Sequence, residues 1–276
     1  MKEITLKDGR TLGWCEWGPD DGVPVIFCTG AGMSGSLGFG YDHLERLGIR
    51  LIAPHRPGSG SSSIHRDKTL TSWAGDVAEL LAHERIQACH VVGFSMGTPF
   101  ALALTGVCEV KSLALVAGQD QFSYPETYQL LSADVKCVLD KLHHDAAEFE
   151  RMIAAQATAD WLWGFIINTS SEQDASFYTE AVFSAAYRQC LQEGFMQGAE
   201  SYARDLVNAW GEWPVRPEEV DCPVSLWYGA FDHSDVHSPD AGASLERRFP
   251  HATRNFLPYA GNSVLWIQAG DILAAL

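Results

Sequence analysis

A Gly-Phe-Ser-Met-Gly sequence at residues 93–97 directly follows a continuous apolar segment, and this feature constrains the fold more than any other. The apolar segment 89–94 is typical of a buried strand, and the residues after Met96 have the spacing of a helix. A serine between two glycines at such a junction is typical of a sharp turn that raises its hydroxyl above the end of a sheet. The pattern favours Ser95 as a nucleophile over an ordinary helix-capping serine.

Short apolar segments alternate with helical patterns along most of the chain. Strands are predicted at 3–7 and 11–17, around an Asp8-Gly9 turn, and at 23–28, 49–53, 89–94, 112–116, 224–228 and 253–257. Helices are predicted at 71–85, from about 96 through 104, at 239–249 and at 264–276. Because apolar strands alternate with helices, we expect an α/β fold with a mostly parallel eight-stranded sheet and helices on both faces.

The segment 119–214 has a different pattern. It contains no clear strand and is rich in Ala, Gln, Glu and aromatic residues, whereas strand patterns return after Trp213-Pro214. These properties indicate a helical insertion. We expect a core formed by residues 1–118 and 215–276, with a helical cap at 119–214.

The composition limits the partners of the chain. Its 276 residues carry 19 Lys and Arg against 35 Asp and Glu, a formal charge of −16, which disfavours nucleic acid and anionic membranes. Seven scattered cysteines without a CxxC pair indicate neither a zinc site nor a disulfide framework and favour a reducing, cytoplasmic location. No apolar segment is long enough to span a bilayer. We expect a small-molecule substrate, no cofactor or metal ion, and a monomer or homodimer.

Five motifs make the chain resemble the α/β-hydrolase fold family, in particular its small serine hydrolases with a helical cap, over nearly the whole length. They are Thr29-Gly30-Ala31, Ala53-Pro54-His55-Arg56-Pro57-Gly58-Ser59-Gly60, residues 93–97, Trp227-Tyr228-Gly229-Ala230-Phe231-Asp232 and Tyr259-Ala260-Gly261-Asn262-Ser263-Val264. The resemblance implies acyl transfer to water through an acyl-serine intermediate, with nucleophile, acid and base in that chain order.

The resemblance also assigns an oxyanion hole. In this family one donor is the backbone N–H of the residue after the nucleophile, here Met96, and the second comes from the loop after the strand at 23–28, here Ala31. Each preorganised donor would contribute roughly 10²–10³-fold to the rate. A glycine-rich turn without function is the alternative interpretation of that loop.

The acid position of this chain agrees with the family, whereas the base position does not. Asp232 follows the strand at 224–228, where the family has the triad acid, and Asp235 is the second candidate. The family has a histidine after Gly261, but this chain has Asn262, whose amide cannot shuttle a proton near neutral pH. Because loss of the base lowers turnover by about 10⁴–10⁶-fold, the resemblance predicts an inactivated or strongly impaired hydrolase.

Three explanations for Asn262 stay open. The chain is an engineered inactive variant, a natural protein that uses the pocket for binding or other chemistry, or an enzyme in which another histidine is the base. His55 is the first candidate for such a base, because its loop opens on the edge of the sheet that carries the nucleophile. His233 and His237, which flank the expected acid, are weaker candidates.

The predicted pocket is apolar. It is expected to be lined by residues beside the nucleophile and the oxyanion loop and by two or three cap aromatics, with Gly30, Met33, Phe94, Trp161 and Trp163 as candidates. The predicted function is hydrolysis of a small apolar ester, lactone or amide. A catalytically silent ligand-binding protein and a non-hydrolytic lyase or acyltransferase on the same fold are the alternatives.

Overall fold

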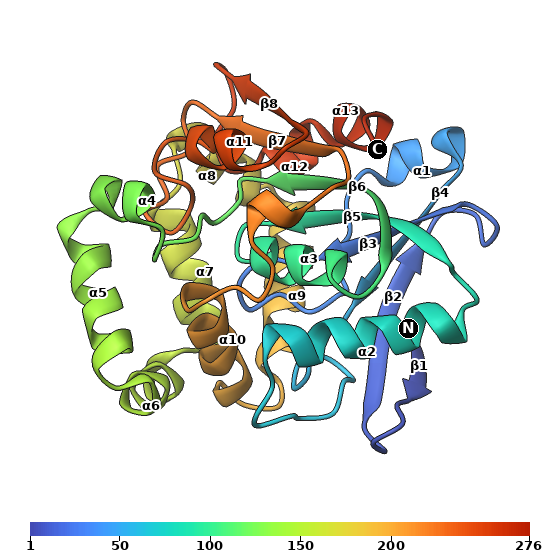
Figure 1. Cartoon of the computed structure of the whole chain (residues 1–276), viewed down its shortest axis with the longest axis horizontal. Coiled ribbons are helices and arrows are strands. Elements are labelled where there is room, and N and C mark those ends of the chain that lie inside the picture. Colours follow the sequence, from blue (N-terminus) through green and yellow to red (C-terminus); the bar gives the residue numbers. More distant parts are fainter.

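An eight-stranded sheet runs through the computed structural model, which describes residues 1–276 (Figure 1). The strand order is β1-β2-β4-β3-β5-β6-β7-β8; β1 and β2 pair antiparallel with their neighbours and all other pairs are parallel. The strands are β1 (Lys2–Thr5), β2 (Thr11–Trp17), β3 (Val23–Cys28), β4 (Ile49–Pro54), β5 (Ala88–Phe94), β6 (Glu109–Val116), β7 (Val224–Gly229) and β8 (Ala252–Leu257). The predicted α/β fold with a mostly parallel eight-stranded sheet is therefore confirmed.

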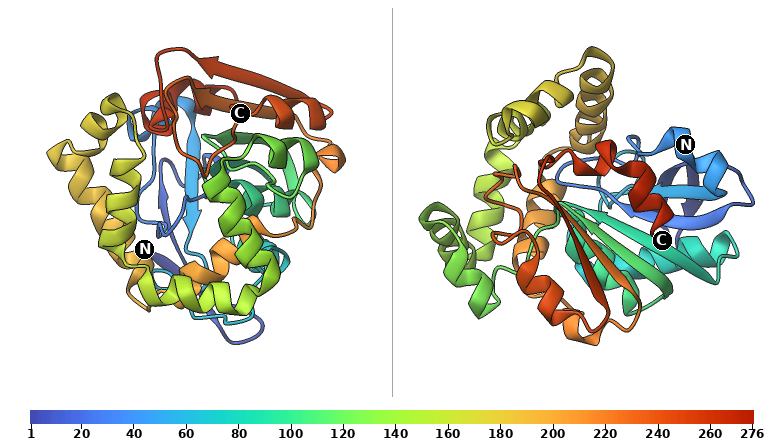
Figure 2. Two further views of the ribbon diagram at one scale, coloured as in Figure 1. Left: turned by 90° about the vertical axis from the view of Figure 1, so that its left-hand side faces the viewer. Right: turned by 90° about the horizontal axis from the view of Figure 1, so that it is seen from above.

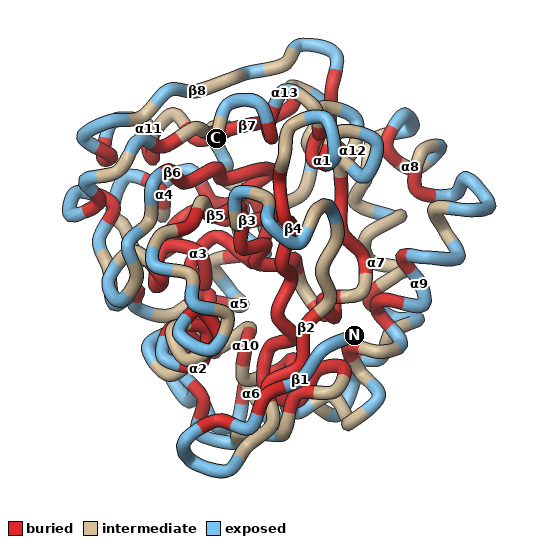
Figure 3. Tube along the Cα trace, turned by 90° about the vertical axis from the view of Figure 1, so that its right-hand side faces the viewer, coloured by how far each residue is buried: buried red, intermediate tan, exposed pale blue.

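Helices cover both faces of the sheet. α2 (Leu70–His83), α3 (Gly97–Thr105) and α11 (Ala243–Arg248) pack in one apolar core, and α1 (Tyr41–Leu47), α12 (Val264–Ile267) and α13 (Ala269–Ala274) in the other. Within β3, Val25 and Phe27 face the second core while Ile26 and Cys28 face the first, as expected for a strand buried on both sides. Figure 3 shows the central strands largely buried, whereas the edge strands β1 and β8 are mostly exposed or half-buried.

Two predicted helices are shorter in the structure. The helix expected at 239–249 begins only at Ala243, because Ala241 and Gly242 have φ angles of 52° and 79°, which no right-handed helix contains. The helix expected at 264–276 is divided into α12 and α13 at Gln268, whose φ of −115° lies outside the helical region.

Seven helices lie between β6 and β7, and we call residues 119–214 the cap segment. The helices are α4 (Pro125–Leu130), α5 (Ala133–His144), α6 (Ala146–Gln156), α7 (Ala159–Asn168), α8 (Glu172–Tyr178), α9 (Ala181–Phe195) and α10 (Glu200–Trp210). Four of them begin at a side chain that accepts a backbone N–H of the first turn, namely Ser132, Asp145, Thr158 and Ser171. Figure 2 shows these helices beyond the carboxyl ends of the parallel strands.

The segment before β7 contains a short 3₁₀ helix, η1 (Pro217–Glu219). All seven cysteines are free thiols. None of the helices combines the length and the apolar character that crossing a bilayer would require.

Candidate active site

Ser95 lies at the sharp turn between β5 and α3. Its φ of 53° is a left-handed conformation that few non-glycine residues adopt, and its backbone N–H donates to the Val116 carbonyl of β6 at 3.0 Å. A Cβ atom at Gly97 would lie 2.1 Å from the Cys28 carbonyl oxygen, and one at Gly93 would lie 2.8 Å from a side chain of α3. The two glycines therefore let the turn pack directly against the end of β3 and against α3.

The Ser95 hydroxyl contacts a histidine from a distant part of the chain. Its Oγ lies 2.8 Å from Nε2 of His237, and Nδ1 of the same ring lies 2.7 Å from Oδ2 of Asp232. The other carboxylate oxygen of Asp232 accepts the Ser234 N–H at 3.1 Å. All three side chains of this hydrogen-bonded chain are buried. This is the arrangement that a serine nucleophile, a general base and an orienting acid require.

One loop, between β7 and α11, carries both Asp232 and His237, which are five residues apart. The loop turns back on itself where the His237 N–H donates to the Ser234 carbonyl at 3.0 Å. The next residue, Ser238, donates its N–H to the Gly118 carbonyl beyond β6 at 2.9 Å. The backbone thus holds the imidazole between the Asp232 carboxylate and the Ser95 hydroxyl.

His55 has contacts that keep both ring nitrogens away from this chain. Its Nδ1 accepts the Gly35 N–H at 2.8 Å, and its Nε2 lies 3.9 Å from the Cys15 sulfur. Burial of the ring lowers its pKa to about 4, so it is neutral near neutral pH. The expectation of His55 as an alternative base is therefore corrected: its ring accepts a hydrogen bond from a loop, and His237 contacts Ser95.

Asn262 follows β8 and lines the cavity that also contains Ser95 and His237, but its backbone N–H and its Nδ2 group contact the cap segment. Its N–H donates to Oδ2 of Asp174 at 3.0 Å, and its Nδ2 donates to Oγ of Ser170 at 3.3 Å. The expectation that position 262 is the base position is thus corrected. The group on Ser95 comes from the loop after β7, and Asn262 joins the turn after β8 to α8.

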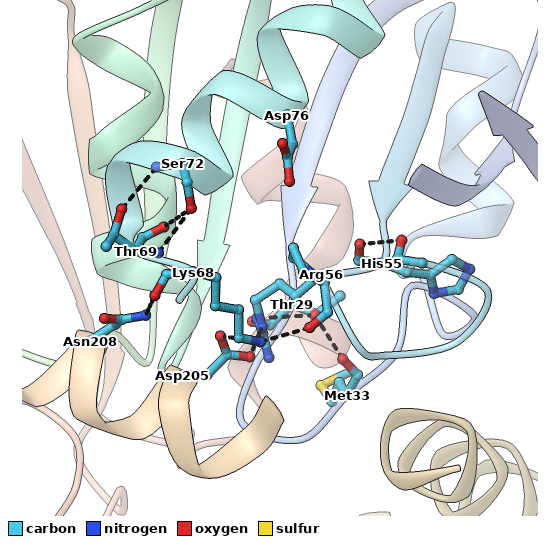
Figure 4. A network of polar contacts seen from close by, with 12 residues as sticks. Thr29, Met33, His55, Arg56, Lys68, Thr69, Ser72, Asp76, Asp205 and Asn208 are labelled. Atoms are coloured by element: carbon cyan, nitrogen blue, oxygen red, sulfur yellow. Dashed lines mark hydrogen bonds and ion pairs between the residues drawn. The ribbon is translucent and has the colours of Figure 1, made fainter. Parts of the chain in front are cut away.

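The backbone N–H groups of Ala31 and Met96 donate no hydrogen bond within the protein, and both residues line a cavity with Ser95. The loop that carries Ala31 is held by the buried Arg56 guanidinium, which donates to the carbonyls of Thr29 and Gly30 at 2.7 Å each (Figure 4). Two free donors beside a reactive hydroxyl are what an oxyanion hole needs, and Ala31 and Met96 have this position relative to Ser95.

Two cavities meet at Ser95 and share Ala31, Leu162, Phe165 and Val236. The large cavity, about 220 Å³, is almost entirely apolar and extends under the cap segment, where it is lined by Val138, Phe149, Ile153, Trp161, Leu206 and Trp210. The small cavity, about 50 Å³, lies on the His237 side and is lined by Phe94, Ile166, Tyr178, Tyr187, Ser234 and Asn262.

Two of the five predicted pocket residues line these cavities, and the other three do not. Phe94 lines the small cavity and Trp161 the large one, whereas Gly30, Met33 and Trp163 line neither. Met33 is buried in the core on the α1 face of the sheet, and Trp163 packs against the Tyr187 ring at 5.8 Å. These three expectations are corrected: Gly30 has no side chain to reach a cavity, and the side chains of Met33 and Trp163 are held in packing contacts elsewhere.

Comparison with known sequences identifies the family to which this fold and serine-centred site belong. The sequence profile of the family described as alpha/beta hydrolase fold matches residues 23–268, most of the chain. This chain therefore belongs to the α/β-hydrolase fold family.

Individual relatives are more distant. An uncharacterized hydrolase, YcgS, of Bacillus subtilis is 26% identical over 168 residues, which cover 60% of this chain and 52% of the relative. The chain thus spans about half the length of that curated relative. A non-heme chloroperoxidase of Streptomyces lividans is 31% identical over 103 residues, 35% of this chain and 36% of that protein.

Solved structures resemble the whole chain. The enol-lactonase of Burkholderia xenovorans LB400 has a TM-score of 0.72 at 16% identity and covers 99% of this chain and 97% of its own. The esterase EaEST of Exiguobacterium antarcticum has a TM-score of 0.70 at 16% identity, with 99% and 96% covered. Identities this low establish the shared fold alone.

Proposed function

We propose that the chain is a serine hydrolase that cleaves small esters or lactones with an apolar acyl part through an acyl-serine intermediate. The observation that carries this proposal is the chain of contacts from Ser95 Oγ to His237 Nε2 at 2.8 Å and from His237 Nδ1 to Asp232 Oδ2 at 2.7 Å. The esterase and lactonase names of proteins with the same fold agree with it. A small amide stays within the proposed substrate class.

In the first half of the reaction, Ser95 Oγ attacks the carbonyl carbon while Nε2 of His237 takes its proton. The oxyanion that forms would accept the backbone N–H groups of Ala31 and Met96. The C–O bond then breaks, the leaving oxygen takes the proton from Nε2, and the acyl group stays on Ser95. Asp232 remains ionised, orients the ring and stabilises the imidazolium.

In the second half, water attacks the acyl-enzyme and gives its proton to Nε2. Collapse of the second tetrahedral intermediate releases the carboxylic acid and returns the proton to Ser95 Oγ. With His237 in this role, Asn262 does not remove the base. The impairment that its position suggested is therefore not part of the proposal.

The two cavities support separate positions for the leaving group and the acyl part of the substrate. The leaving group lies where His237 can protonate it, which is the small cavity that contains this histidine. The acyl part then occupies the large apolar cavity under the cap segment, which we propose acts as a lid over the site.

The test is hydrolysis of nitrophenyl esters with short and medium acyl chains. We expect Ser95→Ala and His237→Asn to lower turnover by about 10⁴–10⁶-fold. His233→Asn is the matched control, since it changes a histidine on the same loop without touching the contacts of Ser95, and it should stay close to the wild type. A His237→Asn enzyme as active as the control would overturn the assignment of the base.

A wild-type protein that hydrolyses no ester, lactone or amide but binds one of them in calorimetry would overturn catalysis itself. That outcome would favour the alternative of a catalytically silent ligand-binding protein.

A further inference from the structure

The carbonyl oxygen of Asn262 is a buried acceptor without a donor. Asn262 is 5% exposed, and its Oδ1 has no hydrogen-bond partner in the protein. A buried polar atom left in this state is unfavourable, and a native structure that contains one needs a reason.

The orientation of the amide follows from its neighbour. The Ser170 hydroxyl has one hydrogen, which it donates to the Ile166 carbonyl at 2.7 Å. Its oxygen can therefore only accept from Asn262, whose Nδ2 lies 3.3 Å away. Exchanging the two ends of the amide would place an oxygen against Ser170 without any hydrogen between them. The unpaired end of Asn262 is thus its oxygen.

Asn262 is one of the residues that line the small cavity beside Ser95 and His237. Two phenols, of Tyr178 and Tyr187, line the same cavity, and burial raises the pKa of each, so both stay protonated. Most of the other lining residues are apolar. A molecule in the small cavity therefore meets mainly apolar side chains, two phenols and the Ser234 side chain, beside a residue whose Oδ1 no protein group satisfies.

We propose that Oδ1 of Asn262 accepts a hydrogen bond from an O–H or N–H on the leaving group of the substrate. This inference rests on the proposed function, which places the leaving group on the His237 side of Ser95. The substrate class then narrows to esters of short alcohols that carry a second hydroxyl or an N–H. A cavity of about 50 Å³ holds roughly three to five groups of the size of water, which limits the leaving group to a few heavy atoms.

The unpaired Oδ1 explains how the site would discriminate between substrates. A site built to hydrogen-bond a hydroxyl discriminates strongly against an analogue without it, because the buried acceptor is then left unpaired. The experiment compares hydroxyethyl hexanoate with propyl hexanoate, which have the same acyl group and differ in O–H against CH₃ at the end of the leaving group. We expect kcat/KM of the wild type to favour the hydroxyethyl ester by about tenfold, which is 1.4 kcal/mol.

Variants separate the acceptor from general effects on the site. Asn262→Leu removes the acceptor at similar size, and its preference should fall to near one while propyl hexanoate is still hydrolysed. Thr169→Val is the matched control, because Thr169 lines the same cavity but donates its hydroxyl to the Phe165 carbonyl at 2.9 Å. The control should keep the preference of the wild type.

Two results would overturn the inference. One is a wild-type preference at or below one, which is decisive even if Asn262→Leu does not fold. The other is an unchanged preference in a folded Asn262→Leu protein. If the wild type hydrolyses neither ester, the proposed function fails separately, and calorimetric binding of the two esters decides instead. Equal dissociation constants would then overturn the role of Asn262, and tighter binding of the hydroxyethyl ester would support it.

Discussion

Arg56 Nε lies 2.9 Å from Oδ2 of Asp205, and this buried ion pair joins the loop after β4 to α10 of the cap segment (Figure 4). Lys68 Nζ lies 2.7 Å from the second oxygen of the same carboxylate. Because Arg56 also donates to the carbonyls of Thr29 and Gly30, the carboxylate on the cap segment is connected through one guanidinium to the loop that carries Ala31.

We expect Asp205→Asn to lower the free energy of unfolding by about 3–5 kcal/mol, because it leaves two buried cations without their counter-charge. Turnover of the folded variant should fall as well, since Arg56 holds the loop of Ala31, which we propose as an oxyanion donor. Urea unfolding measures the first effect. The control is Asp160→Asn, which breaks an exposed pair with Arg188 and should change stability by less than about 1 kcal/mol. Equal losses in the two variants would contradict a structural role for Asp205.

Asn262→His tests which position holds the base. We expect no gain in kcat/KM, because His237 already contacts Ser95 Oγ and a new ring would displace the contact between Asn262 and Ser170. Steady-state kinetics on one activated ester suffices as a measurement. A rise of about 10⁴-fold or more would instead make residue 262 the base position and His237 a bystander.

Filling the large cavity should change the choice of acyl chain. Ile153→Trp on α6 adds a ring to the wall of this cavity, so hydrolysis of octanoyl esters should fall while acetyl esters are retained. Ala155→Trp places the same side chain on an exposed position of α6 and serves as the control. The measurement is kcat/KM against chain length, and a parallel profile in both variants would exclude this cavity as the acyl site.

His55 should make the fold sensitive to acid. Its pKa is lowered from 6.5 to about 4 by burial, so between these values the unfolded chain binds a proton that the folded protein does not. Its contribution is fully present above pH 6.5 and is lost as the pH falls toward 4. Asn in its place offers an oxygen to the Gly35 N–H but does not titrate. We expect His55→Asn to lose less stability between pH 6.5 and 4, by up to about 1.4 kcal/mol per pH unit.

Comparing the wild type with His55→Asn also controls for the other groups that titrate in this pH range. Burial raises the pKa of Asp120 to about 6, which acts in the opposite direction, because the folded protein then holds a proton that the unfolded chain releases. Both proteins contain Asp120, so its effect cancels in the difference. Parallel curves of unfolding free energy against pH would refute the role of His55.

Gly97→Ala should damage the site more than an ordinary helix substitution. The added Cβ would lie 2.1 Å from the Cys28 carbonyl oxygen, so the end of β3 and the loop after it, which carries Ala31, must move. We expect a loss of both stability and kcat. Gly75→Ala on α2 has open space around its Cβ and should stabilise the protein by about 0.5–1 kcal/mol. Thermal unfolding and ester hydrolysis of the pair separate the two effects.

The sequence by itself determined the fold and the turn that carries Ser95. Apolar strand patterns and helical periodicity are local properties, and each strand of the sheet was found within a few residues of its predicted position. The turn at Ser95 is local as well, because two glycines at fixed spacing and a following helix dictate it.

Only the tertiary structure decided which histidine faces Ser95. His55 and His237 both lie in loops near the expected site, and His237 is 142 residues from Ser95 in the chain. One local signal favoured His237: an aspartate and a histidine on one loop can meet without help from distant elements. The contact with Ser95 still depends on the path of that loop, which the Ser238 N–H fixes against the Gly118 carbonyl.

The tertiary structure also decided which side chains line the pocket. Trp161 and Trp163 lie two residues apart on α7, yet only Trp161 lines the large cavity, because the two side chains point to different sides of the helix. The buried contacts of Asn262 with Ser170 and Asp174 join two segments that are far apart in the chain. Local patterns set the elements, whereas the packing of the cap segment against the sheet set which side chains meet at Ser95.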